Sequence, residues 1–290
     1  MSISKTKHAL LMKRRYYRKK LQYFLMRHVI PISHRDLKAF RTGPKVFANS
    51  IPKAGTNLLK RTLNLLPCVV PWWTYHIVET IPGILDQLQT VKNGQVVTAH
   101  LPWSKSLVEI LISKGFVIIF IIRDLRDKAV SDVHYLVHKS TDHQLHRYFS
   151  SLNSDEERLM AYIRGVPEHC HPGGIRPKLW EDHTKRMLPW LDEPNCMTIR
   201  FEDLIGSSGG GSDKKQIETV DAIVKHIGIK LSKEEIRQIA AKSFFTGSRT
   251  FRKGQIGDWR NHFTEEHKQI FKEVHGDTLI RLGYEKDYDW

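Results

Sequence analysis

The sequence predicts an α/β fold, a single domain with a parallel sheet of four or five strands flanked by helices. Apolar runs of strand length alternate with helical segments along the chain, and this order is typical of a parallel sheet. The run 116–122 is apolar without alternation, as expected for a central strand covered on both faces. The 290 residues are enough for one large domain, predicted at 43–290, after a basic N-terminal segment at 1–42.

The N-terminal segment carries most of the net charge. Residues 1–41 hold twelve Lys or Arg and one acid, so they contribute +11 of the total +15. Residues 9–28 are predicted to be a basic helix with apolar side chains such as Tyr17 and Leu21. Such a helix can lie on an anionic membrane, bind a polyanion or dock on its own domain, and the sequence leaves these three open.

Cysteine spacing and hydropathy predict a cytoplasmic protein. The three cysteines are widely spaced and odd in number, which argues against a disulfide framework and favours a reducing compartment. No apolar run reaches the ~20 residues that a membrane span needs, and no secretory signal is recognised. Attachment to the cytoplasmic face of a membrane through residues 1–41 is the alternative.

The first α/β unit begins with a short buried strand at 46–50. A tight turn follows, and then a helix from Leu58 to Leu66, which Pro67 ends because proline cannot continue a helix. Residues 68–95 are rich in aromatic and turn-forming residues. They are predicted to be a loop with one short helix at 84–90.

The rest of the chain repeats the alternation. A strand at 95–99 and a helix at 106–113 lead to the central strand, and a helix runs from Arg123 to about Lys139. A capping-box-like start at Ser154 opens a helix that ends at Arg164. The other predicted elements are a loop or short helix at 140–154, a turn at 169–174, a helix at 178–190, a strand at 197–201, a flexible loop at 207–212 and helices at about 214–227, 232–242 and 264–282.

Residues 50–57, here called the phosphate-binding loop, join the first strand to its helix. Lys53 supplies a cation, and Gly55 lets a ligand approach the backbone because it has no Cβ. Thr56 and Asn57 present donors at a helix start, which favours an anion. This is not the P-loop of nucleotide triphosphatases, because the lysine precedes the glycine.

Two further phosphate-type groups lie later in the chain. Arg123 and Ser131 are about two helical turns apart after the central strand, so both can meet one phosphate. Arg252, Lys253 and Gly254 place side-chain and backbone donors together. Since ligands bind at strand carboxyl ends in open α/β sheets, the groups together suggest a nucleotide with phosphates at both ends.

The sequence resembles the sulfotransferases that use 3′-phosphoadenosine 5′-phosphosulfate (PAPS), closest to their cytosolic small-molecule branch. The similar stretches occur in the family's order and cover about residues 44–285. They are 50–57 for the 5′-phosphosulfate loop, 98–102 for KTHLP, 123–131 for the 3′-phosphate motif, 200–204 for YEDL and 251–264 for RKGxxGDWKNxFT.

The resemblance implies in-line transfer of a sulfuryl group from PAPS to a hydroxyl or amine of a small-molecule or lipid acceptor, with 3′-phosphoadenosine 5′-phosphate (PAP) as the product. His100 is implied as the base and Lys53 as the cation at the departing phosphate oxygen. The implied donor contacts are Lys53, Ala54, Gly55, Thr56, Asn57, Leu58, Arg123, Ser131, Phe201, Phe244, Phe251, Arg252, Lys253 and Gly254. The implied acceptor-pocket wall is Trp72, Trp73 and Trp103. No metal and no nucleic-acid partner are expected.

The sequence also departs from the family pattern. Thr98 stands where the family has a lysine, so one cation is missing, and Lys105 is a candidate replacement. Leu58 stands where the family has an adenine-stacking tryptophan, and Phe244 or Phe245 is a candidate for that role. Three alternatives stay open. They are a glycan sulfotransferase of the same fold, a nucleotide kinase, and an inactive protein that binds membranes or polyanions.

Overall fold

The computed structural model describes residues 34–71, 74–77, 84–167, 179–247 and 251–290, together with Tyr17 and Leu21. Its centre is a five-stranded sheet in the order β2-β3-β1-β4-β5, in which every paired strand is parallel. The predicted fold class is therefore confirmed. The strands are β1 (Lys45–Ser50), β2 (Thr74–Ile77), β3 (Val96–Ala99), β4 (Phe116–Ile122) and β5 (Cys196–Arg200).

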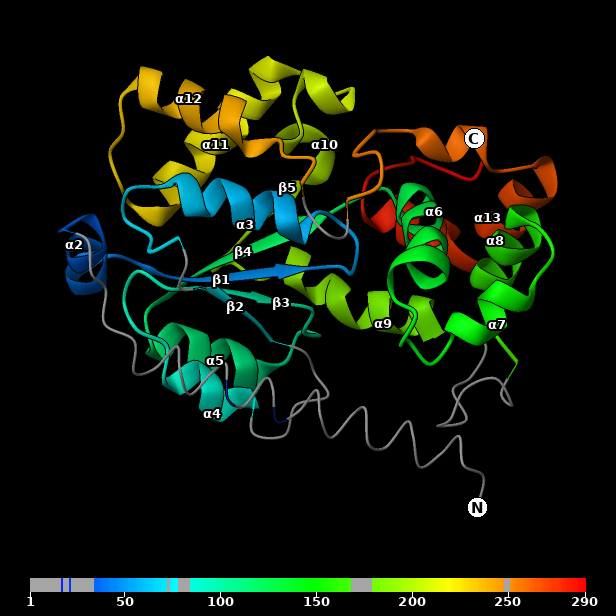
Figure 1. Cartoon of the computed structure of the whole chain (residues 1–290), viewed down its shortest axis with the longest axis horizontal. Coiled ribbons are helices and arrows are strands. Elements are labelled where there is room, and N and C mark those ends of the chain that lie inside the picture. The colour runs from blue at the N-terminus through cyan, green and yellow to red at the C-terminus, as the bar shows by residue number, and fades with distance from the viewer. Residues whose placement is uncertain are drawn as a thin grey trace.

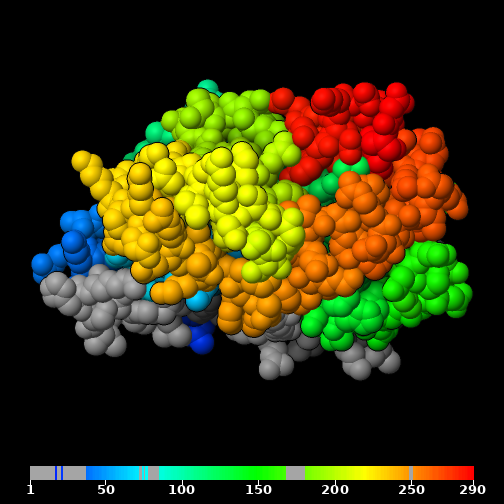
Figure 2. All heavy atoms as spheres, turned by 90° about the horizontal axis from the view of Figure 1, so that it is seen from above, coloured from blue at the N-terminus to red at the C-terminus, as the bar shows by residue number. Residues whose placement is uncertain are grey.

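Helices cover both faces of the sheet and gather at the carboxyl ends of its strands (Figure 1). Helices α3 (Thr56–Leu65), α11 (Asp213–Ile227) and α12 (Lys233–Ser243) cover one face, and α4 (Ile84–Gln89) and α5 (Lys105–Ser113) cover the other. The helices beyond the carboxyl ends are α6 (Leu125–His134), α7 (His146–Ser151), α8 (Asp155–Arg164), α9 (Leu179–Met187) and α13 (Glu265–Arg281). Figure 2 shows α11 and α12, in yellow and gold, beside the orange segment that follows residue 251.

The central strand β4 contributes to two cores. Phe120 and Ile122 pack on the side of α5, whereas Ile119 and Ile121 pack on the side of α3 and α11. Successive side chains of a strand point to opposite faces. Both faces are buried, and this explains why the strand is apolar without alternation.

Strand β2 corrects the sequence prediction, which assigned this region to a loop. The strand pairs with β3 so that His76 lies opposite Thr98. It is four residues long and lies at the edge of the sheet. So short a segment, beside aromatic and turn-forming residues, has no periodicity that identifies a strand.

Three other predicted elements differ in detail. The helix predicted from Arg123 to Lys139 consists of α6 followed by a π-helical turn, η1 (Tyr135–Lys139). The strand predicted at 197–201 ends one residue earlier, because Phe201 begins the short helix α10 (Phe201–Leu204). The predicted flexible loop at 207–212 contains a 3-10 turn, η4 (Ser207–Gly209). Two further 3-10 turns lie in the described part of the chain, η3 (Leu188–Leu191) and η5 (Asp258–Asn261).

The N-terminal segment is described only in part. Helix α2 (His34–Thr42), which was not predicted, packs its buried Ala39 near Val70. The predicted helix at 9–28 lies outside the described residues except for Tyr17 and Leu21, which are helical and each 58% exposed. None of the described helices has the length and apolar character needed to cross a membrane.

Candidate active site

The phosphate-binding loop turns through two residues with positive φ. Lys53 has φ 64°, which is unusual for a residue with a side chain, and Gly55 has φ 105°. A Cβ at Gly55 would lie 2.6 Å from Cδ2 of Phe201. The glycine is therefore needed for the close packing of Phe201 on the loop as well as for its conformation.

Ser50 links the phosphate-binding loop to the end of β3. The register pairs Asn49 with Ala99, so Ser50 lies beside His100. The Ser50 hydroxyl is 2.6 Å from the Thr56 hydroxyl and 3.0 Å from Nδ1 of His100. Asn49 fixes the same junction, because its side-chain amide exchanges hydrogen bonds with the backbone of Leu101 at 2.9 and 3.0 Å.

The hydrogen bonds of His100 define its tautomer. Nδ1 lies 2.8 Å from the Ser50 carbonyl oxygen, which can only accept, so Nδ1 carries the hydrogen. The lone pair is then on Nε2, the nitrogen that a base uses. Burial lowers the pKa of His100 to about 4 and outweighs the hydrogen bond to Ser50, which raises it. The imidazole is therefore in its basic form at neutral pH.

Lys53 is a desolvated cation inside this site. Burial is the largest effect on its pKa and lowers it, with help from Arg123, Lys128 and Arg252, while Asp132 raises it. The Lys53 ammonium lies 4.3 Å from the centroid of the Tyr135 ring, which the π-helical turn η1 presents. A partly buried cation interacts more strongly with an entering anion than a fully solvated cation does.

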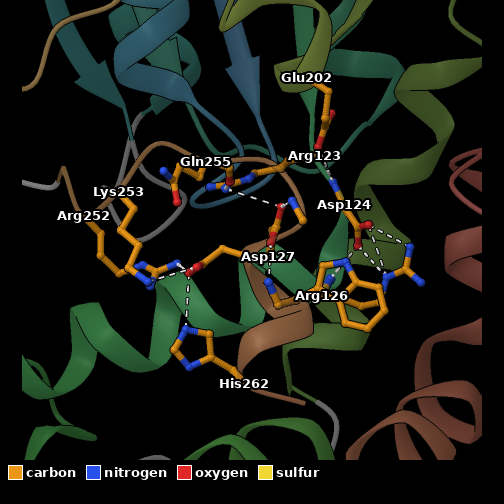
Figure 3. Close-up of polar contacts among 12 residues, drawn as sticks. Arg123, Asp124, Arg126, Asp127, Glu202, Arg252, Lys253, Gln255 and His262 are labelled. Carbon is orange, nitrogen blue, oxygen red and sulfur yellow. Dashed lines mark hydrogen bonds and ion pairs between the residues drawn. The ribbon is translucent and has the colours of Figure 1, made fainter. Parts of the chain in front are cut away.

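Arg123 belongs to the second phosphate-type group and is held rigidly at the end of β4. The register places Ile122 beside Arg200, so the Arg123 guanidinium lies over the Phe201 ring at 4.2 Å. Its NH2 atom donates to the Gln255 carbonyl at 2.8 Å (Figure 3). Its Nε atom is buried and has no partner within the described part of the chain. A buried guanidinium with a spare donor fits a phosphate group.

Arg252 and Lys253 converge on one carboxylate (Figure 3). Their side chains bond to Asp258 at 2.5 and 3.0 Å, and His262 lies 3.3 Å from it. Burial opposes the charge of Asp258, but the bonds from Lys253 and Arg252 outweigh it and lower the pKa of this carboxyl group. Asp258 thus holds the two cations of the third group together beside Arg123.

Asp127 and Gly209 fix the loop that carries the third group. The fully buried Asp127 carboxylate accepts the backbone N–H groups of Gly257 at 2.7 Å and Trp259 at 2.9 Å, and it lies 3.7 Å from Arg123. The carbonyl of the buried Gly209 accepts the Ile256 N–H at 3.1 Å. The loop at 207–212, expected to be flexible, is therefore a support for the site.

The structure brings the three phosphate-type groups and His100 to the carboxyl end of the sheet. Four of the predicted donor-contact residues are buried there, namely Ala54, Leu58, Ser131 and Phe201. The side chain of Asn57, another of them, is exposed. Phe244 and Phe251 meet edge to face at 5.9 Å beside Gly254, whose φ is 63°.

Of the three tryptophans predicted to form the acceptor-pocket wall, the structure describes one. Trp103 is half-buried on the core, and its indole N–H donates to Glu193 at 3.2 Å. Trp72 and Trp73 lie outside the described residues. Lys105, the candidate replacement for the missing cation, has a side chain that is 85% exposed and lies 3.9 Å from Glu109, and no contact shown for it disfavours or supports that role. Helix α5 presents it to solvent.

Several residues of the site were not predicted from the sequence. Asp127 and Asp258 lie inside the stretches 123–131 and 251–264 that resemble the family. Their side chains position cations and backbone N–H groups, and residue spacing alone does not predict such contacts. Tyr135 reaches Lys53 only through the π-helical turn. The pair Lys128 and Asp132 has i,i+4 spacing, which is a recognisable signal, but such pairs are usually solvated.

Comparisons with known proteins agree with this geometry. A family model described as "Sulfotransferase domain" matches residues 43–283. Rat sulfotransferase 2A1 is 27% identical over 247 residues, which are 77% of this chain and 80% of the relative. Guinea pig 3-alpha-hydroxysteroid sulfotransferase is 27% identical over 270 residues, 82% and 84% of the two chains.

Two solved structures are similar in fold. Mouse sulfotransferase SULT7A1, complexed with PAP, has a TM-score of 0.60 at 20% identity and covers 85% of this chain and 90% of its own. Retinol dehydratase, in complex with retinol and PAP, has a TM-score of 0.55 at 18% identity and covers 84% of each chain.

Proposed function

The chain belongs to the PAPS-dependent sulfotransferase family, and we propose that it moves the sulfuryl group of PAPS to a hydroxyl of a small apolar acceptor, with His100 as the base. The observation that carries this proposal is the hydrogen bond between Nδ1 of His100 and the Ser50 carbonyl at 2.8 Å. It leaves Nε2 free to accept a proton beside the phosphate-binding loop.

The proposed donor site uses all three phosphate-type groups. Gly55, Thr56 and Asn57 hold the 5′-phosphate at the start of α3, where backbone N–H groups favour an anion. The 3′-phosphate binds to Arg123, Ser131, Arg252, Lys253 and Gly254. The buried Nε of Arg123 supports this assignment, because it has a donor to offer and no partner among the described residues.

The proposed transfer conserves atoms and charge. The acceptor oxygen forms a bond to sulfur as the bond from sulfur to the 5′-phosphate oxygen breaks. His100 takes the acceptor's proton on Nε2, and Lys53 stabilises the negative charge that develops on the leaving phosphate oxygen. PAP leaves with that charge, and the proton returns from His100 to solvent.

An apolar alcohol is the acceptor class that we favour over a glycan. The names of the relatives support it, since one is a 3-alpha-hydroxysteroid sulfotransferase and one structural neighbour holds retinol. A screen with sulfur-labelled PAPS against a hydroxysteroid, a phenol and a glycan tests this. Label transferred only to the glycan would overturn the acceptor class, and label transferred to none of them would favour an inactive binding protein.

PAP should bind in the micromolar range or tighter, and AMP and ATP roughly 100-fold or more weakly. Charge-assisted hydrogen bonds are worth about 1.5–3 kcal/mol each, and the 3′-phosphate, which only PAP carries, is offered several. Isothermal titration calorimetry measures the three affinities. AMP is the matched control because it differs from PAP by this phosphate alone. Equal affinity for PAP and AMP would remove the basis of the donor assignment.

Residues 1–41 are proposed to attach the protein to an anionic membrane surface. The concentration of +11 in this segment supports the proposal, as do the exposed Tyr17 and Leu21, which are one helical turn apart. Deleting residues 1–33 should abolish sedimentation with vesicles that contain phosphatidylserine and leave PAP affinity unchanged. The deletion keeps α2, whose Ala39 is buried on the domain. Undiminished sedimentation would favour docking of the segment on its own domain.

A further inference from the structure

Arg126 is a buried cation that the proposed transfer does not use. Its side chain is only 3% exposed, and it forms ion pairs with Asp124 at 2.8 Å (Figure 3) and with Glu285 at 2.6 Å. A buried charge is costly unless it is paired. Arg126 meets this condition by joining two distant parts of the chain, because Asp124 precedes α6 and Glu285 follows α13.

The guanidinium group of Arg126 also lies in the corner between two tryptophan rings. It is 4.3 Å from the centroid of the Trp259 ring and 4.4 Å from that of the Trp290 ring. The two rings meet edge to face at 5.9 Å, with an interplanar angle of 86°. A cation over an aromatic face is attracted electrostatically, and an edge-to-face ring pair adds to this attraction. We call Arg126, Trp259, Glu285 and Trp290 the Arg126 cluster.

Arg126 is poorly placed to bind a phosphate group itself. Its Nε and NH2 atoms bond to Asp124, and its NH1 atom bonds to Glu285. Arg123 differs in this respect, because its buried Nε atom has no partner in the part of the chain that the structure describes. The Arg126 cluster can therefore affect a ligand through the protein and not by direct contact.

The segment after α13 brings Glu285 and Trp290 to the cluster. Residues 286–289 are exposed, whereas Trp290 is half-buried and packs on the core. The start of the segment is fixed near the end of β5, because the Tyr284 hydroxyl donates to Glu202 of α10 at 2.7 Å. Figure 1 shows the end of the segment, marked C, beside the orange turn η5 that carries the other tryptophan.

Trp259 connects the cluster to the third phosphate-type group. It follows Asp258, the carboxylate that bonds to Arg252 at 2.5 Å and to Lys253 at 3.0 Å. Asp258 and Trp259 both lie in η5, and Asp127 fixes the backbone of this turn by accepting the Trp259 N–H at 2.9 Å. The Arg126 cluster fixes the Trp259 ring that the turn carries. Because a turn of four residues moves as a unit, a displaced ring would also displace the Asp258 carboxylate.

We propose that Trp290 is a positioning residue of the donor site: through the Arg126 cluster it holds η5 in the conformation in which Arg252 and Lys253 receive the 3′-phosphate of PAP. The inference rests on the proposed function, which assigns that phosphate to these two cations. Charged side chains that are already in place lose less conformational freedom when the phosphate binds, so binding is tighter. The 5′-phosphate is assigned to residues 50–57, which follow another strand, so the effect should be confined to nucleotides with a 3′-phosphate.

Titration calorimetry with PAP and AMP on the 290-residue chain tests this inference. Trp290→Ala should weaken PAP binding on the order of tenfold, because the cation–π and ring contacts are lost, and should leave AMP affinity within about twofold. Glu285→Gln removes the charge that faces Arg126 and should also lower the ratio of PAP to AMP affinity. Trp290→Phe keeps an aromatic ring for Arg126 and should recover most of the PAP affinity. In turnover, Trp290→Ala should raise KM for PAPS and change kcat at saturating PAPS little.

Tyr288→Phe is the matched control from the same segment. Its hydroxyl donates to Asp277 on α13, outside the Arg126 cluster, so both nucleotide affinities should stay at the wild-type level. A purely structural role of Trp290 would lower the melting temperature and leave the ratio of PAP to AMP affinity unchanged, and that result overturns the inference. If Trp290→Ala does not fold, Glu285→Gln decides by the same ratio. Equal affinity of the wild-type chain for PAP and AMP would instead contradict the donor assignment itself, so the wild-type measurement separates the two failures.

Discussion

Replacing His100 with glutamine should reduce turnover by ~10²–10⁴-fold, the usual contribution of a general base. The glutamine side chain can still donate to the Ser50 carbonyl, which His100 now contacts at 2.8 Å, but it has no basic nitrogen. PAP affinity should change little, because His100 lies at the end of β3 and outside all three phosphate-type groups. Steady-state turnover with labelled PAPS and PAP titration calorimetry measure the two quantities.

His76 provides the matched control for this experiment. Its ring lies next to that of His100, with Nδ1 3.0 Å from the Thr98 hydroxyl. Because Nδ1 of His76 lies against the Thr98 hydroxyl, whereas Nδ1 of His100 bonds to Ser50 in the phosphate-binding loop, His76→Gln should retain most of the turnover. Near-normal turnover of His100→Gln would place the base elsewhere, and loss of turnover in His76→Gln alone would move the assignment to β2.

Replacing Lys53 with glycine should lower turnover by about 10²–10³-fold and weaken PAP binding as well. The cation is desolvated in the loop, where burial already lowers its pKa, so it interacts strongly with phosphate in both the ground state and the transition state. Glycine is the informative substitution because Lys53 has φ 64°, a conformation that glycine adopts without strain. The backbone conformation is preserved, and the change removes the ammonium group together with its alkyl chain.

Lys105→Met is the control for loss of a lysine near this region. Its side chain is 85% exposed on α5, so turnover and PAP affinity should both stay at the wild-type level. Lys53→Arg should recover part of the PAP affinity through its charge. Turnover of Lys53→Gly that equals wild type would show that the departing phosphate oxygen is stabilised by other groups.

The family and the fold class were predictable from the sequence. The prediction of a PAPS-dependent sulfotransferase rested on five ordered stretches, and the family match over 43–283 confirms it. The continuous apolar run of β4 predicted a strand covered on both faces, and its side chains do divide between two cores. Both inferences use residues that are close in sequence, whose pattern directly reflects local structure.

The edge of the sheet was not predictable in the same way. Strand β2 has four residues, and among the described strands it pairs with β3 alone. The strand is stabilised by hydrogen bonds to that partner, and its own sequence is too short to show hydrophobic alternation. The sequence of this aromatic and turn-rich stretch therefore did not predict a strand. The π-helical turn at Tyr135 was not predicted either, because helix propensity does not distinguish a π-helical turn from an α-helix.

The sequence alone indicates which residues of this protein carry charge and a titratable nitrogen, and at which strand ends they lie. Only the tertiary structure decided how those groups act on one another. The parallel register brings Ser50 to His100 and Arg123 to Phe201, and it thereby selects the tautomer of the histidine and the orientation of the guanidinium. Burial then decides their chemistry, since the removal of water lowers the pKa of His100.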